Sequence, residues 1–322
     1  MKIRKYKNGD EIGIMKLDRM VEEHPWNRRN LKNWFWKYKG NNPAGRSLVW
    51  VAEINRKIVG TFSIIPMNYK IGSKYFKGSN SIAMIIHPKW QNKGLIKYVS
   101  DKLFEDAKVK KLKFVYGYPN QNAYELHKRV FNYKDINNQN LFYKKLKSFK
   151  QSKLSCEVKK ILYFDKSFNF LWKKLSRQYD VINKRNSNFL NWRYLSRPDQ
   201  KYYCFKFTNK NEILGYVVLK IYRFNKIKTG HFIDIFCNQF SKSIFKDMIE
   251  FGCKFFNEQG CKDVSLWIQG SKNLEKKLLK MKFKIKSSRP FICKLFEKDL
   301  YLKKKLNKRK WYFNMGDSLE IY

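Results

Sequence analysis

The amino-acid sequence predicts an α+β protein, a mixed α/β fold in which one order of strands and helices occurs twice. Short apolar runs predict strands, and amphipathic segments between them predict helices. In each half a similar segment, KIVG or EILG, begins the second strand of a hairpin. We therefore expect two domains, residues 1–150 and 151–322, each a mixed and mostly antiparallel sheet flanked by helices.

The first half begins with a hairpin. Residues 48–54 (LVWVAEI) and 58–66 predict its two strands, joined by a polar turn. The segments expected after it are a strand at 81–86, a helix from 95 to about 111, a strand at 112–117, a helix at 122–131 and a closing strand pair at 133–136 and 141–146.

The second half repeats this order after a helix expected at 168–176. The expected segments are strands at 202–208, 213–221 and 231–236, a helix at 244–259, a strand at 263–268, a helix at 272–281 and a closing strand pair at 283–287 and 291–296.

The segment HPKWQNKGLIKYV joins the strand at 81–86 to the helix that follows. Pro88 ends the strand because proline has no N–H for the ladder, and Leu95, Val99 and Leu103 recur at helical spacing. A helix start offers unpaired N–H groups, and Gly94 would allow close approach of an anion. The segment is either a phosphate site or only a turn.

The net charge of +44 has two interpretations. It indicates a partner rich in phosphate or carboxylate, such as nucleic acid or an anionic surface, or else a compositional drift towards lysine. Residues 303–310 (KKKLNKRK) are interpreted as a solvated connector.

The cysteines and the apolar segments indicate the cellular compartment of the protein. The six cysteines are scattered, as is typical of reduced cytosolic thiols rather than disulfides or a metal site, so we expect no metal. No apolar run is long enough for a transmembrane segment, and the N-terminus lacks the apolar core of a signal peptide. The expected localisation is cytoplasmic.

The order strand, hairpin, strand, P-x-x-Q-x-x-G loop, helix, strand, PN, helix, strand resembles the GNAT (GCN5-related N-acetyltransferase) superfamily. The resemblance covers about residues 48–146 and implies two first helices at 10–20 and 31–39. Five of the six positions in the family's pyrophosphate loop match, and Ile96 stands where the family has a small residue.

The resemblance implies that acetyl-CoA lies in a gap between two parting strands, with a backbone N–H near Ile85 or Ile86 facing the thioester carbonyl. The pyrophosphate would lie on the N–H groups of the loop. The implied contacts with acetyl-CoA are Met84, Ile85, Ile86, Gln91, Asn92, Lys93, Gly94, Leu95, Ile96 and Asn120.

The catalytic groups are less clear from the sequence. The family's general-acid tyrosine would fall at His127, and Tyr124 lies one helical turn before it; either side chain can protonate a thiolate. The base is not assignable, and Glu23, with its neighbours Glu22 and His24, is the next candidate. Asn120 alternatively only caps its helix.

The second half lacks the loop, since CNQFSKS contains no glycine. We therefore interpret it as a degenerate copy that supports the first domain and forms a wall of the acceptor site. Asp234 is either a carboxylate facing the substrate or, preferably, a hydrogen-bonded structural residue.

The function implied is an acyl-CoA-dependent N-acetyltransferase acting on a primary amine of a small molecule. The segments WKYKGNNPAG, FLNWRY and WYFNMGDSLEIY resemble tandem acetyltransferases of surface-polysaccharide biosynthesis, which implies an amino sugar. The alternatives are an aminoacyl-tRNA-dependent transferase with tandem GNAT domains, or a non-catalytic binding protein for nucleic acid or an anionic surface. The oligomeric state is unknown.

Overall fold

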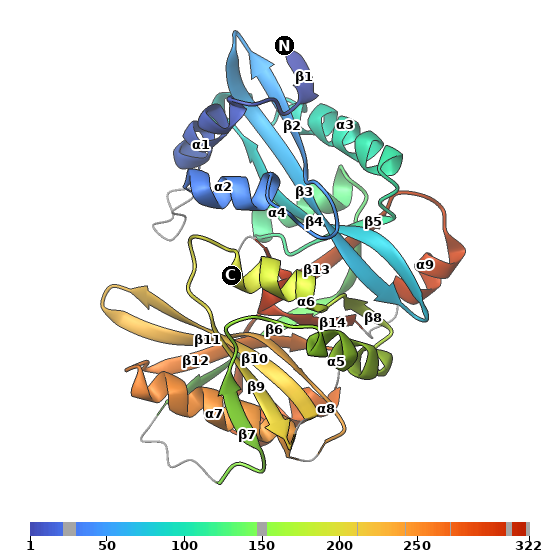
Figure 1. Cartoon of the computed structure of the whole chain (residues 1–322). Helices are drawn as coiled ribbons and strands as arrows, with labels where there is room; N and C mark the ends of the chain where they lie inside the picture. Colours follow the sequence, from blue (N-terminus) through green and yellow to red (C-terminus); the bar gives the residue numbers. More distant parts are fainter. Residues whose placement is uncertain are drawn as a thin grey trace.

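The computed structural model describes residues 1–21, 30–146, 153–210, 212–241, 243–270, 272–306 and 311–319. Two halves meet across one continuous sheet, in which the strand order is β1-β2-β3-β4-β5-β13-β6-β12-β11-β10-β9-β7 (Figure 1). A mixed α/β architecture was predicted, and it is confirmed.

The first half contains β1 (Lys2–Lys5), α1 (Asp10–Val21), α2 (Leu31–Tyr38), β2 (Leu48–Ile54), β3 (Lys57–Ile71), β4 (Lys74–Ile86), α3 (Leu95–Val109), β5 (Phe114–Gly117), α4 (Gln121–Arg129) and β6 (Lys134–Lys145). The second half contains β7 (Glu157–Lys160), α5 (Ser167–Leu175), β8 (Val181–Asn183), α6 (Ser187–Leu190), β9 (Tyr203–Asn209), β10 (Glu212–Phe224), β11 (Ile227–Cys237), α7 (Ile244–Glu258), β12 (Asp263–Gln269), α8 (Lys272–Lys280), β13 (Lys284–Leu295), α9 (Leu300–Leu306) and β14 (Trp311–Asn314).

The β2–β3 hairpin forms where the sequence predicts it. Asn55 and Arg56 both have positive φ angles, 48° and 61°, which is the geometry of a two-residue turn that matches strand twist. Asn225 and Lys226 form the same kind of turn between β10 and β11 in the second half, with φ angles of 45° and 65°. Local turn chemistry therefore sets the register of both hairpins.

Helices cover both faces of the first half of the sheet (Figure 1). On one face, Ile14 and Met15 of α1 and Trp34 of α2 pack against β2. On the other face, α3 buries Leu95, Val99, Leu103 and Phe104 against β2 and β3 in an apolar cluster that we call the α3 cluster. The amphipathic spacing noted in the sequence forms this second contact.

The closing strands differ from the prediction. Each expected strand pair is one long strand, and β6 and β13 lie side by side between β5 and β12. The polar middle of β6, residues 137–140, interrupts its apolar pattern, so the sequence suggested two short strands there. Because β13 pairs with β5 and β6 pairs with β12, each half receives a strand from the other. The division of the chain at residue 150 stays a prediction.

The basic segment near the C-terminus also needs a correction. Lys303 to Leu306 belong to α9 rather than to a connector, because Leu302 and Leu306 are buried in the core. Residues 307–310 lie outside the described ranges.

Two further observations concern the whole described chain. None of its described helices combines the length and the apolar character that crossing a bilayer requires. The six cysteines are free thiols, and all except the half-buried Cys156 are buried.

Candidate functional site

β4 and β5 part in the middle of the first half. They are paired in parallel only at Gly78–Phe114, Ser79–Val115 and Asn80–Tyr116. Beyond these pairs, Ser81 still lies beside Gly117, but residues 82–86 of β4 have no β5 residue opposite them within the described ranges. Ile82, Ile85 and Ile86 continue to pair with β3. A gap therefore opens towards the end of β4, as the resemblance implies.

A bulge in β4 lies at this gap. Ser63 of β3 pairs with Ile82 and Thr61 pairs with Ile85, so Ala83 and Met84 together lie opposite one residue. Ala83 has a φ angle of 48°, a left-handed conformation that is uncommon for alanine. The bulge takes the backbone at Ala83 and Met84 out of the regular ladder with β3, beside the gap.

The loop after β4 folds back onto the strand. Gln91 Nε2 donates to the carbonyl of Ile86 at 3.0 Å. Asn92 and Gly94 have left-handed φ angles of 60° and 72°, and Gly94 is the N-cap of α3. The loop is exposed, and a Cβ on Gly94 would meet nothing within 4 Å.

The backbone N–H groups of this loop are free for a ligand. Within residues 30–146, none of the N–H groups at positions 92–96 donates to another residue, whereas Lys97 N donates to the Gly94 carbonyl at 3.0 Å. Unpaired N–H groups at a helix start, in front of open space, fit an anionic pyrophosphate. The residues present therefore fit acyl-CoA.

Ile96, which departs from the family pattern, packs into the fold. It is half-buried against the α3 cluster, next to the buried Leu95. Lys93 Nζ lies 5.1 Å from the ring centre of Trp90, while Lys97 pairs with Asp101 at 2.7 Å. Among the described residues, neither Lys93 nor Lys89, the two lysines of the loop, has a carboxylate partner.

Asn120 and Tyr124 lie at the start of α4. Asn120 Oδ1 accepts from Ala123 N at 2.9 Å, so this residue caps the helix. Tyr124 Oη donates to Asp135 Oδ1 at 2.8 Å, and Lys128 pairs with the same carboxylate. The hydrogen bond to Asp135 and partial burial raise the pKa of Tyr124, which keeps its proton. Its ring packs on the α3 cluster, as do Met84 and Ile86.

His127 lies deeper. Its Nδ1 donates to the Ala123 carbonyl at 2.7 Å, since a carbonyl can only accept. The ring packs edge-on against Phe62, Phe131 and Tyr133. Burial lowers the pKa of His127 below its ordinary value of 6.5, so the ring is neutral at pH 7 and its one N–H is already used. Both candidate acids thus donate a hydrogen bond within the fold, and they differ in burial: His127 is buried, whereas Tyr124 is half-buried. Glu23 lies outside the described residues, with Glu22 and His24.

The corresponding gap in the second half is filled. β11 and β12 pair in parallel from Thr229–Asp263 to Phe232–Leu266, and beyond that point β14 pairs with Ile268 and Gln269 of β12. Gly270, with a φ angle of 106°, leaves room for the carbonyl of Trp311. A segment of the chain itself therefore occupies the place that acyl-CoA would need.

A buried charge cluster holds this C-terminal segment. Arg185 donates to Asp317 at 2.5 Å and to both oxygens of Asp234 at 3.2 Å. Tyr194 and Tyr216 also donate to Asp234, at 2.9 and 3.0 Å. Asp234 is thus a hydrogen-bonded structural carboxylate, which confirms the preferred interpretation.

The same segment reaches the first gap. Tyr116 Oη donates to the Asp317 carbonyl at 3.1 Å, and Leu319 N donates to Asn80 Oδ1 at 3.4 Å. Asn80 and Tyr116 are the last pair before β4 and β5 part. Sequence reasoning missed this contact, because nothing local in residues 311–319 indicates a partner so distant in the chain.

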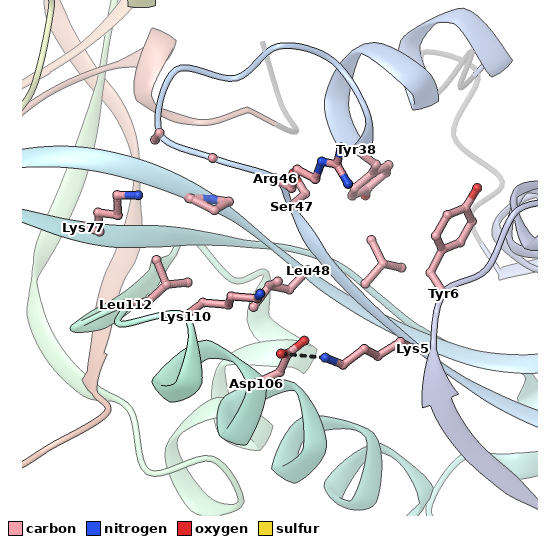
Figure 2. A pocket seen from close by; sticks show the side chains of 14 residues that line it. Lys5, Tyr6, Tyr38, Arg46, Ser47, Leu48, Lys77, Asp106, Lys110 and Leu112 are labelled. Atoms are coloured by element: carbon pink, nitrogen blue, oxygen red, sulfur yellow. Dashed lines mark hydrogen bonds and ion pairs between the residues drawn. The ribbon is translucent and has the colours of Figure 1, made fainter.

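Two cavities lie away from the gap. A cavity of about 450 Å³ lies at the other end of the sheet, near the start of β2, where Lys5 pairs with Asp106 (Figure 2). An open groove of about 720 Å³ lies where α2 meets residues 188–196. No residue of the loop lines either one. The gap is the candidate site for acyl-CoA, because a linear carrier there would complete a sheet rather than fill a cavity.

Comparison with known proteins gives a family match for the first part of the chain. Residues 2–129 match the family model described as "Acetyltransferase (GNAT) domain". No curated protein matches the sequence.

Three solved structures are similar in fold. A GCN5-related N-acetyltransferase from Anabaena variabilis has a TM-score of 0.70 at 14% identity, covering 92% of this chain and 73% of that one. A tandem GNAT protein from the clavulanic acid biosynthesis pathway has a TM-score of 0.63 at 10% sequence identity, and the match covers 92% of this chain and 99% of that one. Saccharomyces cerevisiae N-myristoyltransferase with bound myristoyl-CoA has a TM-score of 0.64 at 10% sequence identity, and the match covers 91% of this chain and 82% of that one. The likeness shows a tandem GNAT fold.

Proposed function

We propose that this chain, whose residues 2–129 are a GNAT acetyltransferase domain, transfers an acetyl group from acetyl-CoA to a primary amine of a small molecule. The observation that carries the proposal is the open gap between β4 and β5, with free loop N–H groups beside it. Residues 1–150 would bind acetyl-CoA. Residues 151–322 would support them as the degenerate copy, since β14 occupies the second gap.

The chemistry requires a neutral amine to attack the thioester and an acid to protonate the departing thiolate. The N–H of Ile85 or Ile86, close to the bulge, would face the developing oxyanion. Tyr124 would supply the proton, and Asp135 orients its hydroxyl.

The acceptor that we propose is an amino sugar of surface-polysaccharide biosynthesis, in the cytoplasm, on the strength of the narrower sequence resemblance. The free N–H groups of the loop favour acetyl-CoA over aminoacyl-tRNA as the donor, because they suit a compact pyrophosphate. They also count against a purely non-catalytic role.

Titration calorimetry with acetyl-CoA tests the first step. We expect one molecule bound per chain, because the second gap is filled by β14. A panel of amino sugars, polyamines and amino acids, scored by release of free coenzyme A thiol, then identifies the acceptor. Absence of acetyl-CoA binding would refute the proposal, and two sites per chain would refute the filled second gap.

Tyr124→Phe tests the acid. We expect kcat to fall about 100-fold or more, as is typical of lost proton transfer, with the acetyl-CoA Kd unchanged. Because the hydrogen bond to Asp135 raises the pKa of Tyr124 above its ordinary value, the alkaline decline of wild-type kcat should begin at a higher pH than for a free tyrosine. Asp135→Asn is the companion variant: it keeps Tyr124 but removes the charge that raises its pKa, so the decline should begin at lower pH. An unchanged kcat in Tyr124→Phe would eliminate Tyr124 as the acid.

A further inference from the structure

Three side chains near the end of β5, two buried and one half-buried, have buried hydrogen-bonding atoms without a partner in the described residues. They are Tyr118 Oη, Gln139 Oε1 and both amide atoms of Gln269. Gln139 and Gln269 are 1% and 3% exposed. Buried polar groups are nearly always paired in native proteins, so this set needs an explanation.

The strand register brings the three together. The ring of Tyr118 lies 5.4 Å from that of Trp267 and 5.9 Å from that of Phe313. Gln269 pairs with Phe313 and lies two residues after Trp267, so it shares the face of Trp267. Leu141 of β6 lies opposite Trp267, and Gln139 is two residues away from Leu141, on the same face. The free atoms therefore share one face of the sheet, just past the end of β5.

This face is the one opposite the pyrophosphate loop. Val115 of β5 packs in the α3 cluster, whereas Tyr116 packs in the core between the halves, on the other face. Tyr118 lies two residues further along and contacts Phe291 and Phe313 of that second core. A group bound at these free atoms would thus approach the gap from the side away from α3, while acetyl-CoA enters by the loop.

The three side chains of this set carry no charge. Two carboxamides and a phenol supply both donors and acceptors, which suit hydroxyl and amine groups but do not balance a full charge. Burial raises the pKa of Tyr118, so its hydroxyl stays protonated and can donate.

We propose that Tyr118, Gln139 and Gln269 form the acceptor subsite. They select an amine whose other polar groups are uncharged hydroxyls. This inference rests on the proposed function. It adds that the acceptor is recognised by hydrogen bonds from uncharged side chains, whose buried atoms have no partner in the free protein and become accessible when the acceptor enters.

Gln269→Met and Tyr118→Phe test the subsite. Because each removes an unpaired polar atom while keeping the shape, we expect the free protein's Tm to stay equal or rise by about 2 °C. The matched controls are Gln239→Met and Tyr216→Phe. Gln239 and Tyr216 are also buried, but they donate to the Gln178 carbonyl at 3.2 Å and to Asp234 at 3.0 Å. The controls should lower Tm by about 2–4 °C.

Turnover is measured with glucosamine and with hexylamine, at saturating acetyl-CoA. We expect wild type to prefer glucosamine, and each subsite variant to lower kcat/KM for glucosamine about 10-fold or more, with hexylamine and the acetyl-CoA Kd unchanged. A Tm loss as large as that of the controls would show a structural role and overturn the inference. So would an unchanged ratio between the two amines, or no preference for glucosamine in wild type. Loss of acetyl-CoA binding in wild type would instead refute the proposed function.

Discussion

Replacing Gly94 with aspartate should weaken acetyl-CoA binding at least 100-fold. A side chain here projects into open space beside the free N–H groups, so a carboxylate would stand where the pyrophosphate charge belongs. Like charges brought together at a binding site cost several kcal/mol, and each 1.4 kcal/mol is about a tenfold change in affinity. Titration calorimetry measures the loss directly.

Gly94→Asn is the matched control for this variant. Asparagine and aspartate have nearly the same size, and both tolerate the left-handed backbone that Gly94 adopts. The strain of losing glycine is then similar in both, and only the charge differs. We expect the asparagine variant to bind within about tenfold of wild type. Equal affinities in the two variants would show that the loop does not hold the pyrophosphate.

Replacing Arg185 with methionine should lower the free energy of unfolding by about 3–5 kcal/mol, the usual cost of removing one partner from a buried ion pair. Arg185 is 1% exposed, and its loss leaves Asp234 and Asp317 buried without the guanidinium. Because this cluster holds β14 in the second gap, we expect the whole interface between the halves to weaken. Denaturant unfolding followed by fluorescence measures the effect.

Arg4→Met is the comparison for Arg185. Arg4 also pairs with two acids, Asp10 and Glu53, but its side chain is 14% exposed and water can replace it. We expect a smaller loss than for Arg185, about 1–2 kcal/mol, because water reaches Arg4 and Glu53. Similar losses in the two variants would show that the fully buried cluster contributes no more than a partly exposed one.

The prediction of the loop succeeded because its signals are local. Pro88 and Gly94 determine where the strand ends and the helix begins, and the apolar spacing after them marks the buried face of α3. The closing strands were predicted less well. The polar middle of β6 suggested a break, but the strand is continuous because β13 pairs with it across residues 137–140, and β12 pairs with its last residues, 141–145.

The candidate acid likewise has features that the sequence predicts and features that only the tertiary structure shows. Position 127 was aligned by sequence with the family's tyrosine, and either His127 or Tyr124 remained possible. The structure adds that His127 packs among three aromatic rings with its Nδ1 on a carbonyl, which is the observation behind our proposal of Tyr124. The burial of a side chain depends on residues that are distant in the sequence, and a local sequence pattern does not contain this information.

By itself, the sequence determined the repeat of elements, the hairpins β2–β3 and β9–β10, and the bounds of the loop between β4 and α3, because turn residues and apolar periodicity act over a few neighbouring positions. The tertiary structure alone decided that the halves exchange β6 and β13, that β14 fills the second gap, and that residues 311–319 reach the first. These features depend on contacts between distant segments, from β12 with β14 to Asn80 with Leu319, and the backbone hydrogen bonds that pair strands carry no residue-specific signal.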